Sequence, residues 1–252
     1  MAQVKEPIPY SEFTKVRLFG KEYNALDLTR EISPDTPVYP GHARTAFWWH
    51  LTHEECVMRL GDTPFEGYAV KGITMADHIA THVDAVYHFN KHRPDLSVEK
   101  FPLEHMFTPA VWIDVSHVPP RTHISLKDIQ DGLAKAGETL RPGDTLMYYT
   151  GASEKWHDAA AFVTQYPGLS AEATEWILDQ GVVNVCTDAV STDNPADITY
   201  PNHTIHGKRL IVHTENIANM NKIPVHRFQL LLMPLKFVGA TGSPVRAIAL
   251  WE

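Results

Sequence analysis

Short β-prone segments recur along the whole chain, and this feature most restricts what it can fold into. The segments either alternate apolar and polar residues or are continuously apolar, and turn-forming residues separate them. The predicted strands cover residues 25–29, 46–55, 110–116, 144–151, 182–190, 208–216, 228–237 and 245–251. Helix signals are clear in two stretches, 125–137 and 168–181, where Ser125 and Ser170 can act as N-caps. The pattern predicts a strand-rich core with few outer helices.

The length of the chain limits how it can be divided. Its 252 residues suffice for one large domain, and neither a low-complexity linker nor an internal repeat interrupts them. Residues 1–22 mix prolines and charges, which is typical of an arm or an edge segment. We therefore predict a single α/β (α+β) domain over residues 23–252, preceded by an N-terminal arm at 1–22.

Charge, the lack of long apolar runs and cysteine content argue against several classes of protein. The net charge of −8 and the lack of a basic patch argue against a nucleic-acid partner. No apolar run approaches membrane-spanning length, and the first residues, MAQVKEPIPY, lack the apolar core of a signal peptide. Only Cys56 and Cys186 are present, which favours a reducing compartment. We expect a cytoplasmic protein with no membrane contact.

The segment HIATHVDAVYHF, residues 78–89, carries His78, His82, Asp84 and His88. With 15 histidines in the chain, chance proximity is a serious alternative. On a continuous strand His78 and His82 would be about 13 Å apart, too far for one ion with ligand bonds near ~2.1 Å. In a helical turn their Cβ atoms approach to within about 6 Å. We therefore predict a bent segment with a helical turn at 78–82 that can hold a metal; the alternative is a capped helix end with solvent-facing histidines.

The same segment resembles the signature of the metal-dependent cyclase superfamily, which contains bacterial kynurenine formamidases and isatin hydrolases. That signature is H-x-G-T-H-x-D-x-P-x-H-F; here Ala80 replaces the glycine and Val86 replaces the proline. Alanine allows close backbone approach unless the position needs a positive φ. Three further stretches resemble the superfamily: VYPG (38–41), TDAVSTD (187–193) and PLKFVGATGSPVRAIAL (234–250). The resemblance covers roughly residues 23 to 252 and implies a single domain of the swivelling β/β/α type.

The resemblance also implies roles for residues of the signature. His78, His82 and Asp84 correspond to metal ligands, and His88 corresponds to a general acid/base beside the metal. Mixed nitrogen and oxygen ligands suit Zn²⁺ and Mn²⁺ about equally.

The downstream segment HTIHGKRLIVHTEN, residues 203–216, resembles the part that supplies a further histidine and a glutamate. The spacing of twelve residues in the superfamily assigns His203 and Glu215, and His206 lies close enough to compete for the histidine role. Glu215 could bridge two ions or orient a water, so it is both a candidate ligand and a candidate catalytic residue. The resemblance thus leaves one or two ions open.

Metal-activated water is the mechanism that needs the fewest further residues. The sequence contains no G-x-S-x-G nucleophile motif and no C-x-x-C, whereas a bound divalent ion can lower the pKa of water to about 7. With an ordinary pKa near ~6.5, His88 could move protons without large tuning. The leading prediction is a hydrolase of a small aromatic amide, either an open formamide or a cyclic amide.

Two other functions remain open: a metal-dependent cyclase or dehydratase, and a non-catalytic metal- or ligand-binding module. The presence of His88 argues against the non-catalytic module, because metal storage needs no proton-transfer group. Aromatic residues ahead of the signature could stack on a planar substrate, although they could equally belong to a sheet core or a subunit interface; they are Phe47, Trp48, Trp49 and Phe65. The resemblance implies a homodimer or homotetramer acting on a small molecule.

Overall fold

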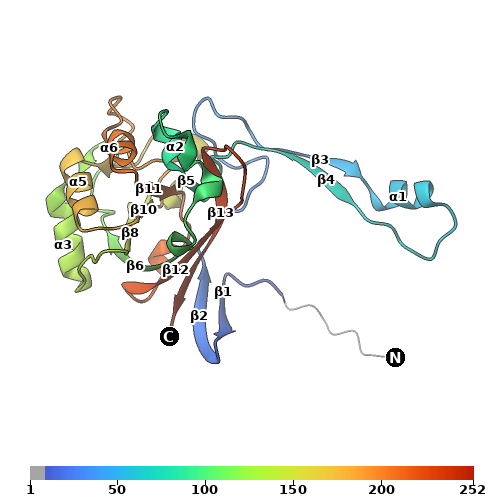
Figure 1. Cartoon of the computed structure of the whole chain (residues 1–252), viewed down its shortest axis with the longest axis horizontal. Helices are drawn as coiled ribbons and strands as arrows, with labels where there is room; N and C mark the ends of the chain where they lie inside the picture. The colour runs from blue at the N-terminus through green and yellow to red at the C-terminus, as the bar shows by residue number, and fades with distance from the viewer. Residues whose placement is uncertain (1–8) are drawn as a thin grey trace.

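The computed structural model describes residues 9–252, and a nine-stranded sheet forms its centre. The strand order is β1-β2-β13-β12-β6-β8-β10-β11-β5, and β5 also pairs with β13. The sheet therefore closes on itself, and the β1–β2 hairpin extends beyond the ring (Figure 1). The strands of this sheet are β1 Phe13–Leu18, β2 Lys21–Asp27, β5 His82–Asp84, β6 Phe107–Asp114, β8 Thr145–Tyr149, β10 Asn184–Thr187, β11 Val212–Glu215, β12 Arg227–Pro234 and β13 Gly242–Trp251.

Alternating side chains on the central strands build two separate cores. On β6, Ala110 packs with the cluster inside the closed sheet, and Val111 packs with a second cluster beneath the helices. Met147 and Leu146 on β8 divide in the same way. Because successive residues of a strand point to opposite faces, both faces of these strands are buried. This matches the continuous apolar runs in the sequence, and the predicted strand-rich α/β class is confirmed.

The two predicted helices are confirmed, with their caps. Helix α3, Leu126–Ala136, begins after a capping box between Ser125 and Asp128 and ends at Gly137 in the left-handed conformation. Helix α5, Ala171–Asp179, has Ser170 as its N-cap. Both helices cover the same side of the sheet, together with α6, Pro201–Arg209 (Figure 1).

Two predicted strands include residues that belong to helices. The segment 46–55 is a strand only as β3, Ala46–Leu51, because Thr52 and Glu55 form a capping box that starts α1, His53–Leu60. The segment 208–216 begins as the last turn of α6 and becomes a strand only at β11. The predicted strand 110–116 begins too late: β6 starts at Phe107, and Pro109 pairs only with β12, since the pairing with β8 starts at Ala110.

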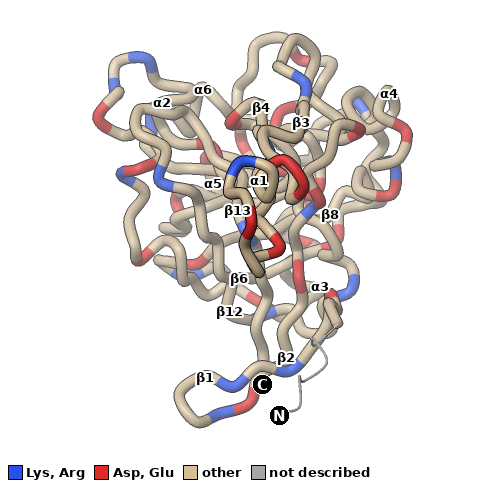
Figure 2. The backbone as a smooth tube through the Cα atoms, turned by 90° about the vertical axis from the view of Figure 1, so that its right-hand side faces the viewer, with Lys and Arg blue, Asp and Glu red and all other residues tan. Residues whose placement is uncertain are grey.

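A long arm projects from this body. It consists of β3, α1 and β4, Val70–Thr74, and its two strands form a separate antiparallel pair. Figure 1 shows it pointing away from the sheet, and Figure 2 looks at the molecule from the arm's tip, with α1 nearest the viewer.

The remaining small elements connect the main ones. They are α2 Val86–Phe89, α4 Ala159–Phe162, the short strands β7 His123–Ile124 and β9 Gly168–Leu169, and five 3-10 turns, η1 Pro94–Leu96, η2 Val98–Lys100, η3 Leu103–Met106, η4 Ala152–Lys155 and η5 Met220–Lys222. Of the predicted N-terminal arm, residues 1–8 lie outside the described part, and β1 is the exposed edge strand of the sheet. Between residues 9 and 252 the chain forms no helix both long and apolar enough to cross a membrane.

Candidate metal centre

The register between β5 and β11 brings four polar side chains together. The two strands are antiparallel neighbours, with Asp84 opposite His213 and His82 opposite Glu215. Residues two apart on a strand share a face, so all four side chains project to the same side. All four residues are buried. A patch of two histidines and two carboxylates therefore results from strand pairing.

His78 reaches this patch by a route other than the predicted helical turn. Residues 77–81 form a bend, not a turn of helix, and Ala80 has a φ of +51°. The left-handed residue reverses the chain, so that the rings of His78 and His82 still lie 5.2 Å apart. Nδ1 of His78 is 2.7 Å from Oδ1 of Asp84, and Nε2 of His82 is 3.1 Å from the same oxygen. Ala80 thus occupies a position that suits glycine, which explains the glycine in the signature.

His88 stands beside the patch without joining it. It lies on α2, where Nε2 is 3.6 Å from Oδ2 of Asp84 and the side chain is 27% exposed. Burial is the largest cause that lowers the pKa of His88, to about 3, and Asp84 opposes the shift. The expectation of an ordinary pKa is therefore wrong: the ring is neutral at neutral pH and can accept a proton only transiently.

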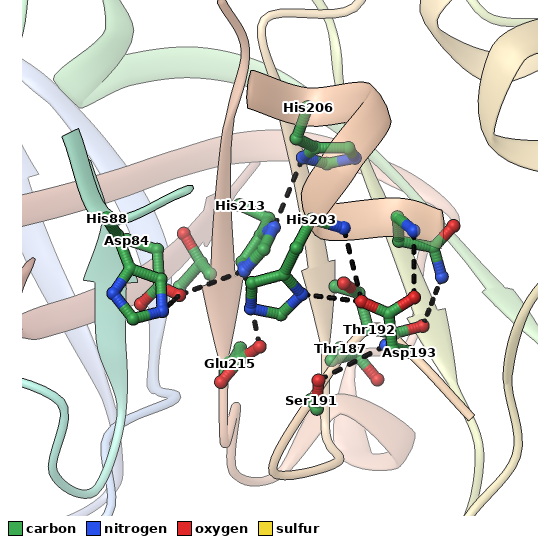
Figure 3. Close-up of polar contacts among 12 residues, drawn as sticks. Asp84, His88, Thr187, Ser191, Thr192, Asp193, His203, His206, His213 and Glu215 are labelled. Carbon is green, nitrogen blue, oxygen red and sulfur yellow. Dashed lines mark hydrogen bonds and ion pairs between the residues drawn. The ribbon is translucent and has the colours of Figure 1, made fainter. Parts of the chain in front are cut away.

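Helix α6 places its two histidines differently. Nδ1 of His203 lies 2.6 Å from Oδ2 of Asp193, and its ring is 4.8 Å from that of His213 (Figure 3). His206, one helical turn later, is fully buried behind His213, with the two Nδ1 atoms 3.2 Å apart. The structure therefore brings His203, rather than His206, to the carboxylates.

The sequence interpretation did not include His213. Its signal was available in VHTE, where His213 and Glu215 are two residues apart on a strand and must share a face. Nε2 of His213 is 3.0 Å from Oδ2 of Asp84 and 3.3 Å from Oε1 of Glu215. This histidine belongs to the same patch.

The side chains form two potential ligand sets that share Asp84. One set is His78, His82 and Asp84; the other is Asp84, His203, His213 and Glu215. Within each set, the potential ligand atoms all lie within 4.8 Å of one another. The mixture of imidazole nitrogen and carboxylate oxygen suits Zn²⁺ and Mn²⁺.

The outer contacts of the histidines also fit metal ligation. Metal-binding histidines usually donate the other ring N–H to an oxygen acceptor, which orients the ring. His82 Nδ1 lies 2.8 Å from the carbonyl of Ala80, and His78 Nε2 lies 2.9 Å from the hydroxyl of Thr241. In addition, Oε1 of Glu215 is buried, and it forms no hydrogen bond with a described residue, although Nε2 of His213 lies at ion-pair distance, 3.3 Å. A cation at the patch would satisfy this oxygen.

The charged groups of the patch shift one another's pKa values. Burial would raise the pKa of Asp84, but the surrounding histidines hold it well below its usual range. Burial would likewise lower the pKa of His213, but Asp84 and Glu215 outweigh it and raise the value to about 10. His82 responds to the same two carboxylates, which raise its pKa to about 8. The carboxylates therefore attract positive charge into a buried place.

A cavity of about 250 Å³ opens above the patch. His88 and the potential ligands other than His213 line it, together with two aromatic rings, Tyr39 and Tyr200, whose hydroxyls lie 3.1 Å apart. Such a volume suits a small molecule. Four predicted substrate-contacting residues are not among the described residues that line the cavity; they are Phe47, Trp48, Trp49 and Phe65, and they lie on the projecting arm.

Comparisons with known proteins agree with this architecture. The sequence pattern of a family described as "Putative cyclase" matches residues 26–194. A kynurenine formamidase of Salinibacter ruber is 29% identical over 232 residues, 88% of this chain and 95% of that protein. An isatin hydrolase of Roseibium aggregatum is 24% identical over 254 residues, 93% of this chain and 94% of that protein.

A solved structure supports the fold. An isatin hydrolase bound to the product analogue thioisatinate has a TM-score of 0.79 and 22% identity, covering 91% of this chain and 92% of that one. The resemblance inferred from the motifs is therefore confirmed.

Proposed function

Since the chain belongs to the putative cyclase family, we propose that this amidohydrolase cleaves the amide C–N bond of a small aromatic substrate with the help of one or two divalent ions. One observation carries the proposal: two potential ligand sets meet at Asp84 on the floor of a cavity, and His88 stands beside them with no place in either set. A proton-transfer group next to a cation site is what hydrolysis by water requires.

In the proposed reaction the ion would activate the carbonyl and the water, and the side chains would transfer the proton and position the substrate. A bound Zn²⁺ or Mn²⁺ would polarise the amide carbonyl and lower the pKa of water at the site. His88, neutral and open to the cavity, takes a proton from the attacking water and returns it to the leaving nitrogen as the C–N bond breaks. Tyr39 and Tyr200 bound the space in which a planar ring would lie.

Two substrate classes follow from the relatives. The similarity to a kynurenine formamidase favours an open arylformamide such as N-formylkynurenine. The similarity to an isatin hydrolase favours a cyclic amide such as isatin. Both are small and have an aromatic ring that bears the amide nitrogen, and both present an amide carbonyl to water.

The test is hydrolysis by chelator-treated protein reloaded with Zn²⁺ or Mn²⁺. N-formylkynurenine and isatin are each supplied while absorbance is followed. We expect turnover of one of them that chelator abolishes and that His88→Ala strongly lowers at equal metal content. If the reloaded protein bound stoichiometric metal and hydrolysed neither compound nor other arylamides, the hydrolase proposal would be wrong, and a cyclase or dehydratase reaction would replace it.

We also propose that the protein is a homodimer or homotetramer through its arm. A two-stranded hairpin is at best marginally stable alone in water, yet this one exposes a group of large apolar side chains; they include Trp48, Trp49, Met58, Leu60, Phe65, Tyr68 and Ile73. Many exposed large apolar side chains on one projecting element are typical of an interaction site, and a second copy offers the same arm in return. Light scattering at micromolar concentration should give a multiple of 28.4 kDa, and a sharp monomer mass would contradict the proposal.

A further inference from the structure

His206 is a buried histidine that the proposed chemistry does not use. It lies on α6 with no exposed surface, and its Nε2 has no hydrogen-bond partner among residues 9–252. Within the described part of the chain, the one polar contact of its side chain is with His213, Nδ1 to Nδ1 at 3.2 Å (Figure 3). Burying an imidazole with so few partners costs free energy, so its place behind His213 calls for an explanation.

The contact between the two rings has a chemical restriction. Two ring nitrogens can form a hydrogen bond only if one carries a proton and the other does not. If His213 holds its proton on Nδ1, its Nε2 is free to bind a cation beside Asp84 and Glu215. If His206 donates instead, the proton of a neutral His213 must sit on Nε2 and block that position. The state of His206 therefore decides whether Nε2 of His213, the nitrogen that faces the carboxylates, carries a proton or is free to bind a cation.

The other potential histidine ligands differ from His213 in the partner of their outer ring nitrogen. The outer nitrogens of His78, His82 and His203 face oxygen atoms, namely the hydroxyl of Thr241, the carbonyl of Ala80 and the carboxylate of Asp193. Only an accepting nitrogen of His206 gives His213 the corresponding partner.

We propose that His206 is a positioning residue: its Nδ1 accepts the Nδ1–H of His213 and thereby makes Nε2 of His213 the fourth protein ligand of a second ion, with Asp84, His203 and Glu215. This inference rests on the proposed metal-dependent function. It goes beyond it, because neither His213 nor His206 is needed for hydrolysis with one ion bound by His78, His82 and Asp84.

The first experiment measures ion binding, not activity. Chelator-treated full-length protein is titrated with Co²⁺ while heat and visible absorption are recorded. We expect two equivalents in the wild type. In His206→Leu the first equivalent should bind as before, while the second should bind ~10–100-fold more weakly and with an altered absorption spectrum, which is the usual effect of losing an outer contact of a ligand. His206→Asn, which keeps a short polar group near the position of Nδ1, should lie closer to the wild type.

Two controls separate positioning from general damage to α6. Ile205→Ala removes a buried neighbour on the same helix, whose side chain packs in the apolar cluster beneath the helices, and it should retain both equivalents. In the background His213→Leu, which itself weakens the second equivalent, adding His206→Leu should have no further effect, because His206 acts through His213. Additive losses would overturn the inference.

A second measurement needs no variant. The ¹⁵N chemical shifts of the His213 ring in the Zn²⁺-loaded protein should report a protonated Nδ1 and a metal-bound Nε2. A proton on Nε2, a wild type that binds only one equivalent, or a His206→Leu protein that binds two ions normally would each overturn the inference and leave the hydrolase proposal standing. A wild type that binds no ion would overturn both.

Discussion

Asp84 and His213 lie directly opposite each other on β5 and β11, with Oδ2 of Asp84 3.0 Å from Nε2 of His213. The other oxygen, Oδ1, faces His78 and His82. One carboxylate thus uses its two oxygens toward two different groups of histidines. Asp84 is the point at which the two ligand sets meet.

Removal of Asp84 should therefore release the ions from both ligand sets. We expect Asp84→Ala to lose its divalent ions during dialysis that leaves them on the wild type, since breaking a buried charge pair also leaves histidines without a counter-charge. Elemental analysis after dialysis measures the result, and circular dichroism checks the fold. His88→Ala is the control. Nε2 of His88 is 3.6 Å from Asp84 and its ring lies 4.0 Å from that of His78, but His88 belongs to neither ligand set, so the variant should keep the wild-type metal content. Equal metal loss in both variants would contradict the assignment.

His88→Ala should instead impair turnover. General acid–base catalysis typically contributes ~10²–10⁴-fold, so kcat should fall within that range at equal metal occupancy. The comparison requires metal content to be measured in the same samples. A variant with full metal and wild-type kcat would mean that His88 transfers no proton in the reaction.

A glycine next to His78 offers a way to disturb one ligand set without changing a ligand. A Cβ at Gly242 would stand 2.7 Å from Cε1 of His78 and 3.0 Å from the carbonyl of Val83. Gly242→Ala should therefore push His78 aside and weaken the first ion, as measured by calorimetric titration. Gly132→Ala is the matched control, because its Cβ would meet only Ile113 in the core. Loss of metal in the control alone would contradict this view of Gly242.

Two buried alanines in the same segment should respond oppositely to glycine. Ala80 has a φ of +51° and Ala85 a φ of −75°. At Ala85, glycine should lower the free energy of unfolding by about 1–2 kcal/mol through lost methyl burial and higher chain entropy. At Ala80 the same losses are offset by relief of roughly 1–2 kcal/mol of left-handed strain, so the change should be close to zero. Denaturant unfolding of the two variants measures the difference, and equal destabilisation would show that Ala80 is unstrained.

The stability of chelator-treated protein should depend on pH through His213. Its folded pKa of about 10 lies above the ordinary value near ~6.5. The contribution to stability is therefore fully present below about pH 6.5 and is lost as the pH rises toward 10. The thermal midpoint should fall across that interval in the wild type and fall less in His213→Leu. A midpoint that rises with pH in the wild type would contradict the raised pKa.

Local sequence determined the parts of this protein that depend on near neighbours. Helices α3 and α5 follow from Ser125 and Ser170, because a cap and an apolar stripe act within a few residues. The approach of His78, His82 and Asp84 is also local, although the backbone route through Ala80 was not predictable without its φ.

Tertiary structure decided what depends on partners far apart in the chain. His213 meets Asp84 across 129 positions, and only the β5–β11 register makes them opposite residues. The projection of the arm away from the main sheet, with Trp48 and Trp49 on it, likewise depends on β3 and β4 pairing with each other and not with the main sheet. Residue spacing constrains groups within one element, whereas pairing between elements is set by the packing of the whole chain. For that reason the place of His213 in the second ligand set, beside the predicted Asp84, His203 and Glu215, became visible only in the folded structure.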